Sequence, residues 1–336
     1  MIKKLKYIVI FEAIIIIILI ALIINLQSQV NKKPETKIGL LAPRVYAEVL
    51  KPKSYLITNF KPLKQDLVNY LGENNSNVAI YIQNLRSGAN MGIHENTAFL
   101  PLSLNKLPIA ITIMEEVEND QISLDTMIPI RQSDKINTYG YLYKNNKTEL
   151  PLKILLEEMV KESDNTALNV LLRYIDQDHL NLLLEYYSID LSAYYSAKVN
   201  YEEHSPLVTP KTMANVFTSL YLSTILEAKD SEYLLSLLTN TSFNVGKIAN
   251  LPPNITIAHK FGVNYLENNK LFSDCGIMYI EDMRISYCIM TKNMTSEKAL
   301  ETIAVIVNKI YYYTLDERKN LNQYKENPNN SKLIIN

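Results

Sequence analysis

The strongest structural constraint in this sequence is a run of about 20 nearly all apolar residues, Tyr7–Leu26. At ~1.5 Å per residue, a helix of this length spans ~30 Å, the thickness of the hydrocarbon core of a bilayer. Glu12 interrupts the run in its first third, where its side chain can reach toward the interface. Because Lys3, Lys4 and Lys6 precede the run, we expect an uncleaved signal anchor with a cytoplasmic N-terminus. The alternative is a helix buried in a protein core.

The rest of the chain divides into segments of different composition. Residues 1–6 form the expected cytoplasmic N-terminus, and residues 27–57 form a proline-containing linker without periodicity. A folded domain is predicted over residues 58–315, followed by a polar C-terminal tail over residues 316–336. The anchor predicts a single-pass protein of the cell membrane, with this domain on the extracytoplasmic side.

The order of the predicted elements indicates an α+β fold. Apolar strands are predicted over residues 77–85 and near Met91, separated by a turn at residues 86–88. The other predicted strands cover residues 255–261, 274–280 and 285–291. The predicted helices cover residues 61–71, 103–117, 152–160, 164–174, 179–187, 211–222, 231–238 and 296–313. Strands, a helical block, a hairpin and a last helix predict an antiparallel sheet flanked by helices, with an inserted all-helical lobe.

Composition argues against several classes of function. Lys plus Arg total 34 against 35 Asp plus Glu, and this net charge of −1 argues against binding nucleic acid through a broad basic surface. The 4 histidines are scattered, the 2 cysteines are too few for a cysteine-built zinc site, and the 8 glycines form no phosphate-binding loop. We therefore expect neither metal nor cofactor. Cys275 and Cys288 flank a predicted turn at residues 281–284, where both a disulfide and a free buried pair are possible.

The first candidate motif is Ser103-x-x-Lys106, at the start of an apolar helix. The spacing of three residues puts both side chains on one helical face. A lysine whose pKa is lowered by burial can take the serine proton, which makes the hydroxyl a nucleophile. Alone, the motif is equally typical of a helix start with a solvated lysine.

Two further motifs follow. Ser163-Asp164-Asn165 precedes a helix and, alone, is typical of an ordinary N-cap. Lys260-Phe261-Gly262 stands at the end of a predicted strand, where a lysine and a glycine are unremarkable by themselves.

Together, Ser-x-x-Lys, Ser-Asp-Asn and Lys-x-Gly in this order resemble the signature of penicillin-recognising serine enzymes. The chain resembles the class A β-lactamase family and its relatives among the penicillin-binding peptidases. The likeness covers roughly residues 58–315 and includes Thr209–Ala214 and Asp274–Asn293. It implies a β-lactamase/transpeptidase-like fold.

The resemblance also implies roles for single residues. Ser103 would attack a carbonyl and become acylated, and Lys106 would help to deprotonate it. Ser163 would relay a proton to the leaving nitrogen, and Asn165 would hold the substrate amide or the lysine.

On the predicted strand, Lys260 would supply positive charge toward a substrate carboxylate, and Gly262 would border the substrate site. The backbone N–H groups of Ser103 and Val263 would form the oxyanion hole. Tyr139 stands where the family places an aromatic residue at the mouth of the cleft.

The sequence departs from the family at two places. Phe261 stands where the family usually has a Thr or Ser whose hydroxyl binds the substrate carboxylate. Neither Val199 nor Ala193, where counting from the flanking motifs puts the deacylating residue of the family, is a glutamate. Glu202 and Glu203 are close enough to substitute, although both are also typical of solvated loop charges.

The expected activity is therefore that of a serine hydrolase which opens a β-lactam amide through an acyl-enzyme on Ser103. A D-Ala-D-Ala peptidase acting on peptidoglycan peptides would use the same site, and the short stretch from Ser163 to Pro210 favours it. Phe261 favours a third hypothesis, an envelope module that binds peptide or glycan without turnover. The expected partners are a β-lactam or peptidoglycan peptide and the membrane, and we expect a monomer.

Overall fold

A computed structural model describes residues 59–189, 207–264 and 271–326, with side chains in the last helix through residue 319. The predicted anchor over residues 7–26, the linker, Glu202 and Glu203 lie outside these ranges. Within them, no helix combines the length and the apolar character needed to cross a membrane.

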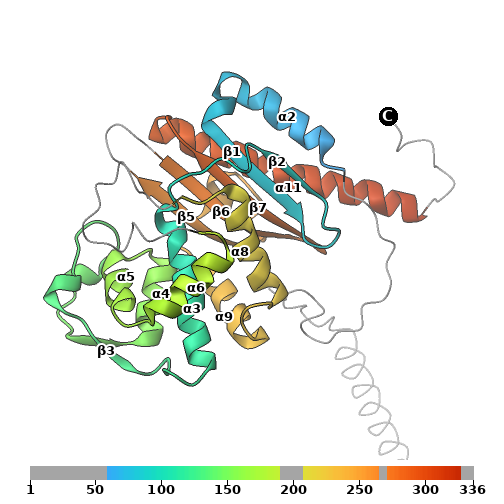
Figure 1. Ribbon diagram of the computed structural model, residues 1–336. Coiled ribbons are helices and arrows are strands. Elements are labelled where there is room, and N and C mark those ends of the chain that lie inside the picture. The colour runs from blue at the N-terminus through green and yellow to red at the C-terminus, as the bar shows by residue number, and fades with distance from the viewer. Residues whose placement is uncertain (1–58, 190–206, 265–270, 327–336) are drawn as a thin grey trace, which may run out of the picture. The chain divides into compact units, whose positions relative to one another are not determined.

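A five-stranded antiparallel sheet forms the centre of the described domain (Figure 1). Its strands, in spatial order, are β2 (Asn90–Ile93), β1 (Val78–Asn84), β7 (Met283–Thr291), β6 (Leu271–Ile280) and β5 (Thr256–Asn264). Every residue of β6 is buried, because both faces of the sheet are covered. β5 is an edge strand, so its outer edge is available to contact other parts of the chain. The five strands predicted from the sequence are confirmed.

Helices from the two ends of the domain cover one face of the sheet (Figure 1). They are α2 (Lys61–Leu71) and α11 (Ser296–Glu326). The leucines of α2 at positions 63, 67 and 71 recur every four residues and are all buried, which gives the helix one apolar face. The short helix α10 (Val245–Ile248) joins this layer, where Asn308 of α11 donates a hydrogen bond to the carbonyl oxygen of Ala249 at 2.8 Å.

The helical lobe and α8 cover the other face. These helices are α3 (Lys106–Glu118), α4 (Leu152–Lys161), α5 (Asn165–Leu172), α6 (Gln177–Tyr186), α8 (Pro210–Leu222) and α9 (Ala228–Leu238). A two-stranded sheet of β3 (Met127–Pro129) and β4 (Glu149–Pro151), which the sequence did not predict, completes the lobe. α3 is buried nearly all round, since its sequence KLPIAITIM has no polar face. The predicted α+β architecture with an inserted helical lobe is therefore confirmed.

The first turn of the helix predicted to begin at Ser103 differs from expectation. Residues Leu102–Asn105 form a 3₁₀ turn, and the α-helix begins at Lys106. Pro108 then falls in the first turn of α3, where its missing N–H group is not needed.

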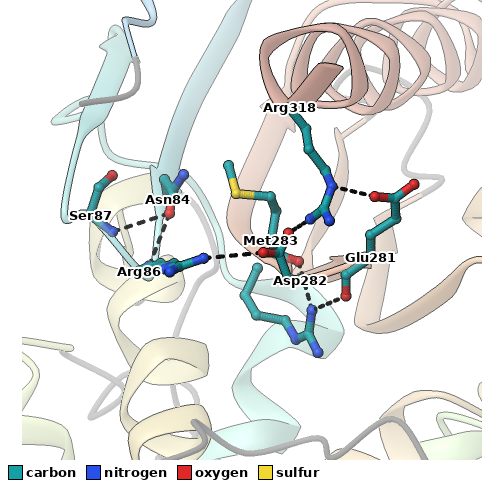
Figure 2. A network of polar contacts seen from close by, with 8 residues as sticks. Asn84, Arg86, Ser87, Glu281, Asp282, Met283 and Arg318 are labelled. Carbon is teal, nitrogen blue, oxygen red and sulfur yellow. Dashed lines mark hydrogen bonds and ion pairs between the residues drawn. The ribbon is translucent and has the colours of Figure 1, made fainter. Parts of the chain in front are cut away.

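The prediction that the last helix ends at Tyr313, before a polar tail, is wrong. α11 continues to Glu326. Arg318, in this extension, forms ion pairs with Glu281 and Asp282 in the β6–β7 turn, and Figure 2 shows these contacts. Arg86 of the β1–β2 turn reaches the same Asp282 at 3.2 Å. Helical residues that show no apolar periodicity of their own thus form ion pairs with a distant turn.

The two cysteines lie directly opposite each other on neighbouring strands. Cys275 of β6 and Cys288 of β7 are register partners, and the structure joins them by a disulfide. Of the two possibilities that the sequence leaves open, the structure has the bridged one.

Candidate active site

A cavity of about 170 Å³ lies where the outer edge of β5 meets the start of α3 and the connection between α4 and α5. The residues predicted from the sequence that line it are Ser103, Tyr139, Ser163, Asn165, Lys260 and Val263. These residues come from four separate segments of the chain. The fold therefore brings the three motifs together around one space.

Lys106 stands at the centre of the polar contacts. Its side chain is 1% exposed, and its Nζ lies 2.6 Å from the Ser163 carbonyl oxygen and 2.6 Å from Asn165 Oδ1. Two hydroxyl oxygens are slightly farther away, Ser163 Oγ at 3.1 Å and Ser103 Oγ at 3.2 Å. The two nearest oxygens can only accept hydrogen bonds, whereas the two hydroxyls can also donate.

The protonation state of Lys106 decides what these contacts can do. A neutral amine has two hydrogens and one lone pair. Its hydrogens satisfy the Ser163 carbonyl and Asn165 Oδ1, which leaves the lone pair to accept a proton from a serine hydroxyl. The geometry thus provides a base next to the Ser103 hydroxyl, and a second hydroxyl beside the same nitrogen.

The edge strand approaches the 3₁₀ turn very closely at Gly262. A Cβ atom at this position would lie 2.9 Å from the Cβ of Leu102 and 3.3 Å from the Ser103 nitrogen. Only glycine allows β5 and the backbone of Ser103 to come into contact in this way. Leu102 has a φ of 53°, a conformation that is rare for leucine and that sets the direction of the chain into Ser103.

Asp164 builds the loop that carries Ser163 and Asn165. Its buried carboxylate accepts backbone hydrogen bonds from Tyr141 at 2.6 Å, Leu142 at 2.8 Å and Ala167 at 2.8 Å. The bond from Ala167 makes Asp164 the N-cap of α5, so the motif is also the ordinary helix cap that the sequence suggested.

A second loop packs against Asp164. Gly140 has a φ of 91°, and a Cβ there would lie 2.1 Å from the Asp164 carboxylate. The neighbouring Tyr139 carbonyl accepts the Asn165 backbone N–H at 3.0 Å, and Thr138 Oγ1 accepts from Asn165 Nδ2 at 2.7 Å. Asn165 is therefore held from two sides, with its Oδ1 directed at Lys106.

Comparison with known proteins identifies the family that has this arrangement of residues. The family model described as the Beta-lactamase enzyme family matches residues 62–314. The chain belongs to this family. Beta-lactamase VEB-1 of Pseudomonas aeruginosa is 22% identical over 268 residues, which cover 74% of this chain and 89% of that protein.

Solved structures agree on the fold. The structure of PBP-A is similar with a TM-score of 0.66 at 20% identity, and the likeness covers 80% of this chain and 100% of that chain. The TLA-1 extended-spectrum β-lactamase is similar with a TM-score of 0.67 at 18% identity, covering 76% and 99%. The chain thus has the β-lactamase/transpeptidase-like α+β fold and is a serine hydrolase of the β-lactamase family.

Both lysines of this β-lactamase-family site are biased toward their neutral forms. Burial lowers the pKa of Lys106 well below its ordinary value, and the charge of Lys260 lowers it further, while Asp164 opposes the shift. Burial lowers the pKa of Lys260 to about 7, against the opposing effects of Asp274 and Glu162. Neutral Lys106 is the form that can accept a proton.

Phe261, where the sequence departs from the family pattern, packs against other aromatic rings. Its ring stacks on Phe243 with ring centroids 3.8 Å apart and planes inclined by 17°, and both rings line the cavity. The ring of Phe272 lies behind it, at 6.1 Å. An aromatic wall therefore occupies the place where the family usually presents a hydroxyl.

The sequence did not predict several cavity residues. They are Thr138, Lys161, Thr241, Ser242, Phe243 and Asn264. Residues 241–243 lie in the connection between α9 and α10 and have neither a motif nor a periodic pattern, so only the fold reveals them. Among the residues with described side chains, no cluster of His, Cys, Asp and Glu is arranged to hold a metal ion.

Proposed function

We propose that this protein is a class A β-lactamase-like hydrolase that opens an amide through an acyl-enzyme on Ser103. The observation that carries the proposal is the environment of Lys106. One buried amine with a lowered pKa lies within reach of two serine hydroxyls, beside a cavity that residues of all three motifs line.

Acylation follows from these contacts. Neutral Lys106 takes the proton of the Ser103 hydroxyl as Oγ forms a bond to the substrate carbonyl carbon. The carbonyl oxygen becomes an oxyanion, which the backbone N–H groups of Ser103 and Val263 would stabilise. One such donor typically contributes ~3–4 kcal/mol. The close approach of β5 to Ser103 at Gly262 supports this assignment, because it brings the two backbones together.

Collapse of the intermediate breaks the carbon–nitrogen bond. The leaving nitrogen needs a proton, and Ser163 can deliver its own while it regains one from the Lys106 ammonium. The amine is thereby returned to its neutral form, and the carbonyl carbon remains bound to Ser103 as an ester. Asn165 keeps Lys106 in place through its Oδ1 and would also face the substrate amide.

Hydrolysis of the ester requires a base for the attacking water. We propose Glu202 and Glu203 as candidates because they are the carboxylates nearest to the expected family position in the sequence. If either one acts as the base, Glu202→Gln or Glu203→Gln should slow release of the acyl group and leave acylation unchanged. Unchanged release in both variants would remove this role.

A second candidate function is that of a D-Ala-D-Ala peptidase on peptidoglycan peptides. The likeness to the whole of PBP-A favours it, and a variant of PBP-A has been solved as an acyl-enzyme complex with penicillin G. Incubating the full chain with penicillin G and following intact mass over time separates the two functions. An adduct that disappears with turnover supports the β-lactamase, and a persistent adduct supports the peptidase. The absence of any adduct would contradict both and favour a binding module without turnover.

We further propose that residues 7–26 anchor this domain to the cell membrane, on the extracytoplasmic side, as a monomer. The apolar run and the preceding lysines support the anchor. Membrane fractionation of the full chain, compared with a chain that begins at residue 58, tests it. Recovery of the full chain in the soluble fraction would contradict it, and a dimer mass in light scattering would contradict the monomer.

A further inference from the structure

A chain of hydrogen bonds leads from the cavity into the core beside β5. Thr241 lines the cavity, and its Oγ1 lies 3.1 Å from His259 Nε2. The other ring nitrogen of His259 lies 2.7 Å from Asp274 Oδ2, and the Tyr287 hydroxyl donates to Asp274 Oδ1 at 2.6 Å. His259, Asp274 and Tyr287 are all buried, and the mechanism proposed above uses none of them.

This series of hydrogen bonds determines whether Thr241 can donate to a ligand or only accept from it. Its hydroxyl has one hydrogen and two protein partners, His259 Nε2 and the carbonyl oxygen of Phe243 at 3.0 Å. If His259 is neutral and protonated toward Asp274, Nε2 is bare and accepts the Thr241 hydrogen. If Nε2 carries a hydrogen, it donates to Thr241, whose own hydrogen then goes to Phe243. In every protonation state, Thr241 presents only a lone pair to the cavity.

The hydroxyl hydrogen of Ser242 is likewise used in a hydrogen bond within the protein. Its hydroxyl donates to the Lys161 carbonyl oxygen at 3.3 Å, and its backbone N–H donates to the same oxygen at 3.0 Å. The stacked rings of Phe243 and Phe261 form the adjoining surface. Thr241, Ser242 and the rings of Phe243 and Phe261 together form an acceptor wall, which offers hydroxyl lone pairs and aromatic faces but no hydroxyl donor.

We propose that Thr241 is a specificity-determining residue, and that this acceptor wall selects substrates whose adjoining group carries an N–H or O–H donor in place of a carboxylate. An uncharged carboxamide fits this description. A carboxylate does not, because its oxygens would face the oxygens of Thr241 and Ser242. This inference rests on the proposed function, since it names the substrate class of the same site.

Two lysines near the wall act in the opposite sense, and the ranking of the three ligands below measures the net effect. Lys161 and Lys260 both line the cavity and could attract an anion. Because burial lowers the pKa of Lys260 to about 7, that ammonium is only partly charged at neutral pH. Lys161 is half-buried at the end of α4, where its carbonyl oxygen holds Ser242.

The test uses three ligands that differ only at this group: penicillin G, its methyl ester and its primary carboxamide. Their dissociation constants are measured by ligand-observed NMR on the full-length Ser103→Ala variant, so that the ranking does not depend on reaction at Ser103. We expect the carboxamide to bind about fivefold more tightly than the ester, since one hydrogen bond separates them. The carboxylate should bind no more tightly than the ester.

Variants at the wall complete the test. Adding Thr241→Val should abolish the advantage of the carboxamide over the ester, and Thr241→Ser should retain it. Adding Phe261→Thr, which supplies a hydroxyl donor, should shift the preference toward the carboxylate and serves as a second readout if Thr241→Val does not fold. Tightest binding of the carboxylate to the Ser103→Ala protein, no binding of any of the three ligands, or a carboxamide advantage that survives Thr241→Val would overturn the inference. Failure of the proposed function would appear separately, as no acylation of the parent protein.

Discussion

Replacing Asp164 with alanine should lower the free energy of unfolding by more than the loss of an ordinary helix cap does. The substitution removes the acceptor of three backbone N–H groups, the part-buried one of Tyr141 and the buried ones of Leu142 and Ala167. At roughly 1–3 kcal/mol for each unsatisfied group, partly relieved by relaxation and entering water, the free energy of unfolding should fall by about 3–6 kcal/mol. Equilibrium unfolding in urea measures this loss.

Asp176 provides a matched control because it caps α6 in the same way. Its exposed carboxylate accepts only from the backbone of Asp178 and His179, so Asp176→Ala should cost about 1 kcal/mol. Faster amide exchange at Tyr141 and Leu142 in Asp164→Ala alone would locate the damage in the loop beside the cavity. A loss in Asp164→Ala no larger than that in Asp176→Ala would refute the reasoning.

Three other predictions concern the cavity itself. Gly262→Ala should lower the rate constant for acylation of Ser103 by about tenfold or more, because the added Cβ pushes β5 away from the Ser103 nitrogen; an unchanged rate in stopped-flow measurements would contradict this. The rate of acylation should rise with pH as Lys106 loses its proton. The affinity for anionic ligands should fall as pH increases through about 7, because Lys260 loses its positive charge there. A pH profile without either change would contradict these assignments. Phe261→Thr should bind penicillin G roughly tenfold more tightly, through a new hydrogen bond to the carboxylate of the ligand. The same variant should lose about 3 kcal/mol in free energy of unfolding, because the aromatic packing of Phe261 is lost. Calorimetry measures the affinity and urea unfolding the stability, and no gain in affinity would mean that the carboxylate is held elsewhere.

The sequence predicted the parts of the site that are encoded locally. Ser103 and Lys106 are three residues apart, and Ser163 and Asn165 flank a helix cap, so each pair has its own local pattern. Strand alternation and helix periodicity likewise reveal the sheet and the helices, because burial of one face repeats at a fixed interval. The shared cavity was predicted from the resemblance of the three motifs, in this order, to the signature of a known family.

The features that the sequence missed depend on contacts between distant segments. Thr241 lines the cavity only because the connection from α9 to α10 returns to β5. The extension of α11 carries Arg318 to the β6–β7 turn, where it forms ion pairs (Figure 2). The polar composition after Tyr313 predicted a tail outside the helix, because no local pattern shows that such a partner exists.

The position of a covalent bond tests the central claim most directly. The full chain is incubated with penicillin G, digested, and mapped by mass spectrometry, with Ser103→Ala and Lys106→Met treated in parallel. The account predicts one acylated peptide that carries its adduct on Ser103, none in Ser103→Ala, and a strongly slowed reaction in Lys106→Met. An adduct on another residue, or an equal adduct in the Ser103→Ala protein, would contradict it.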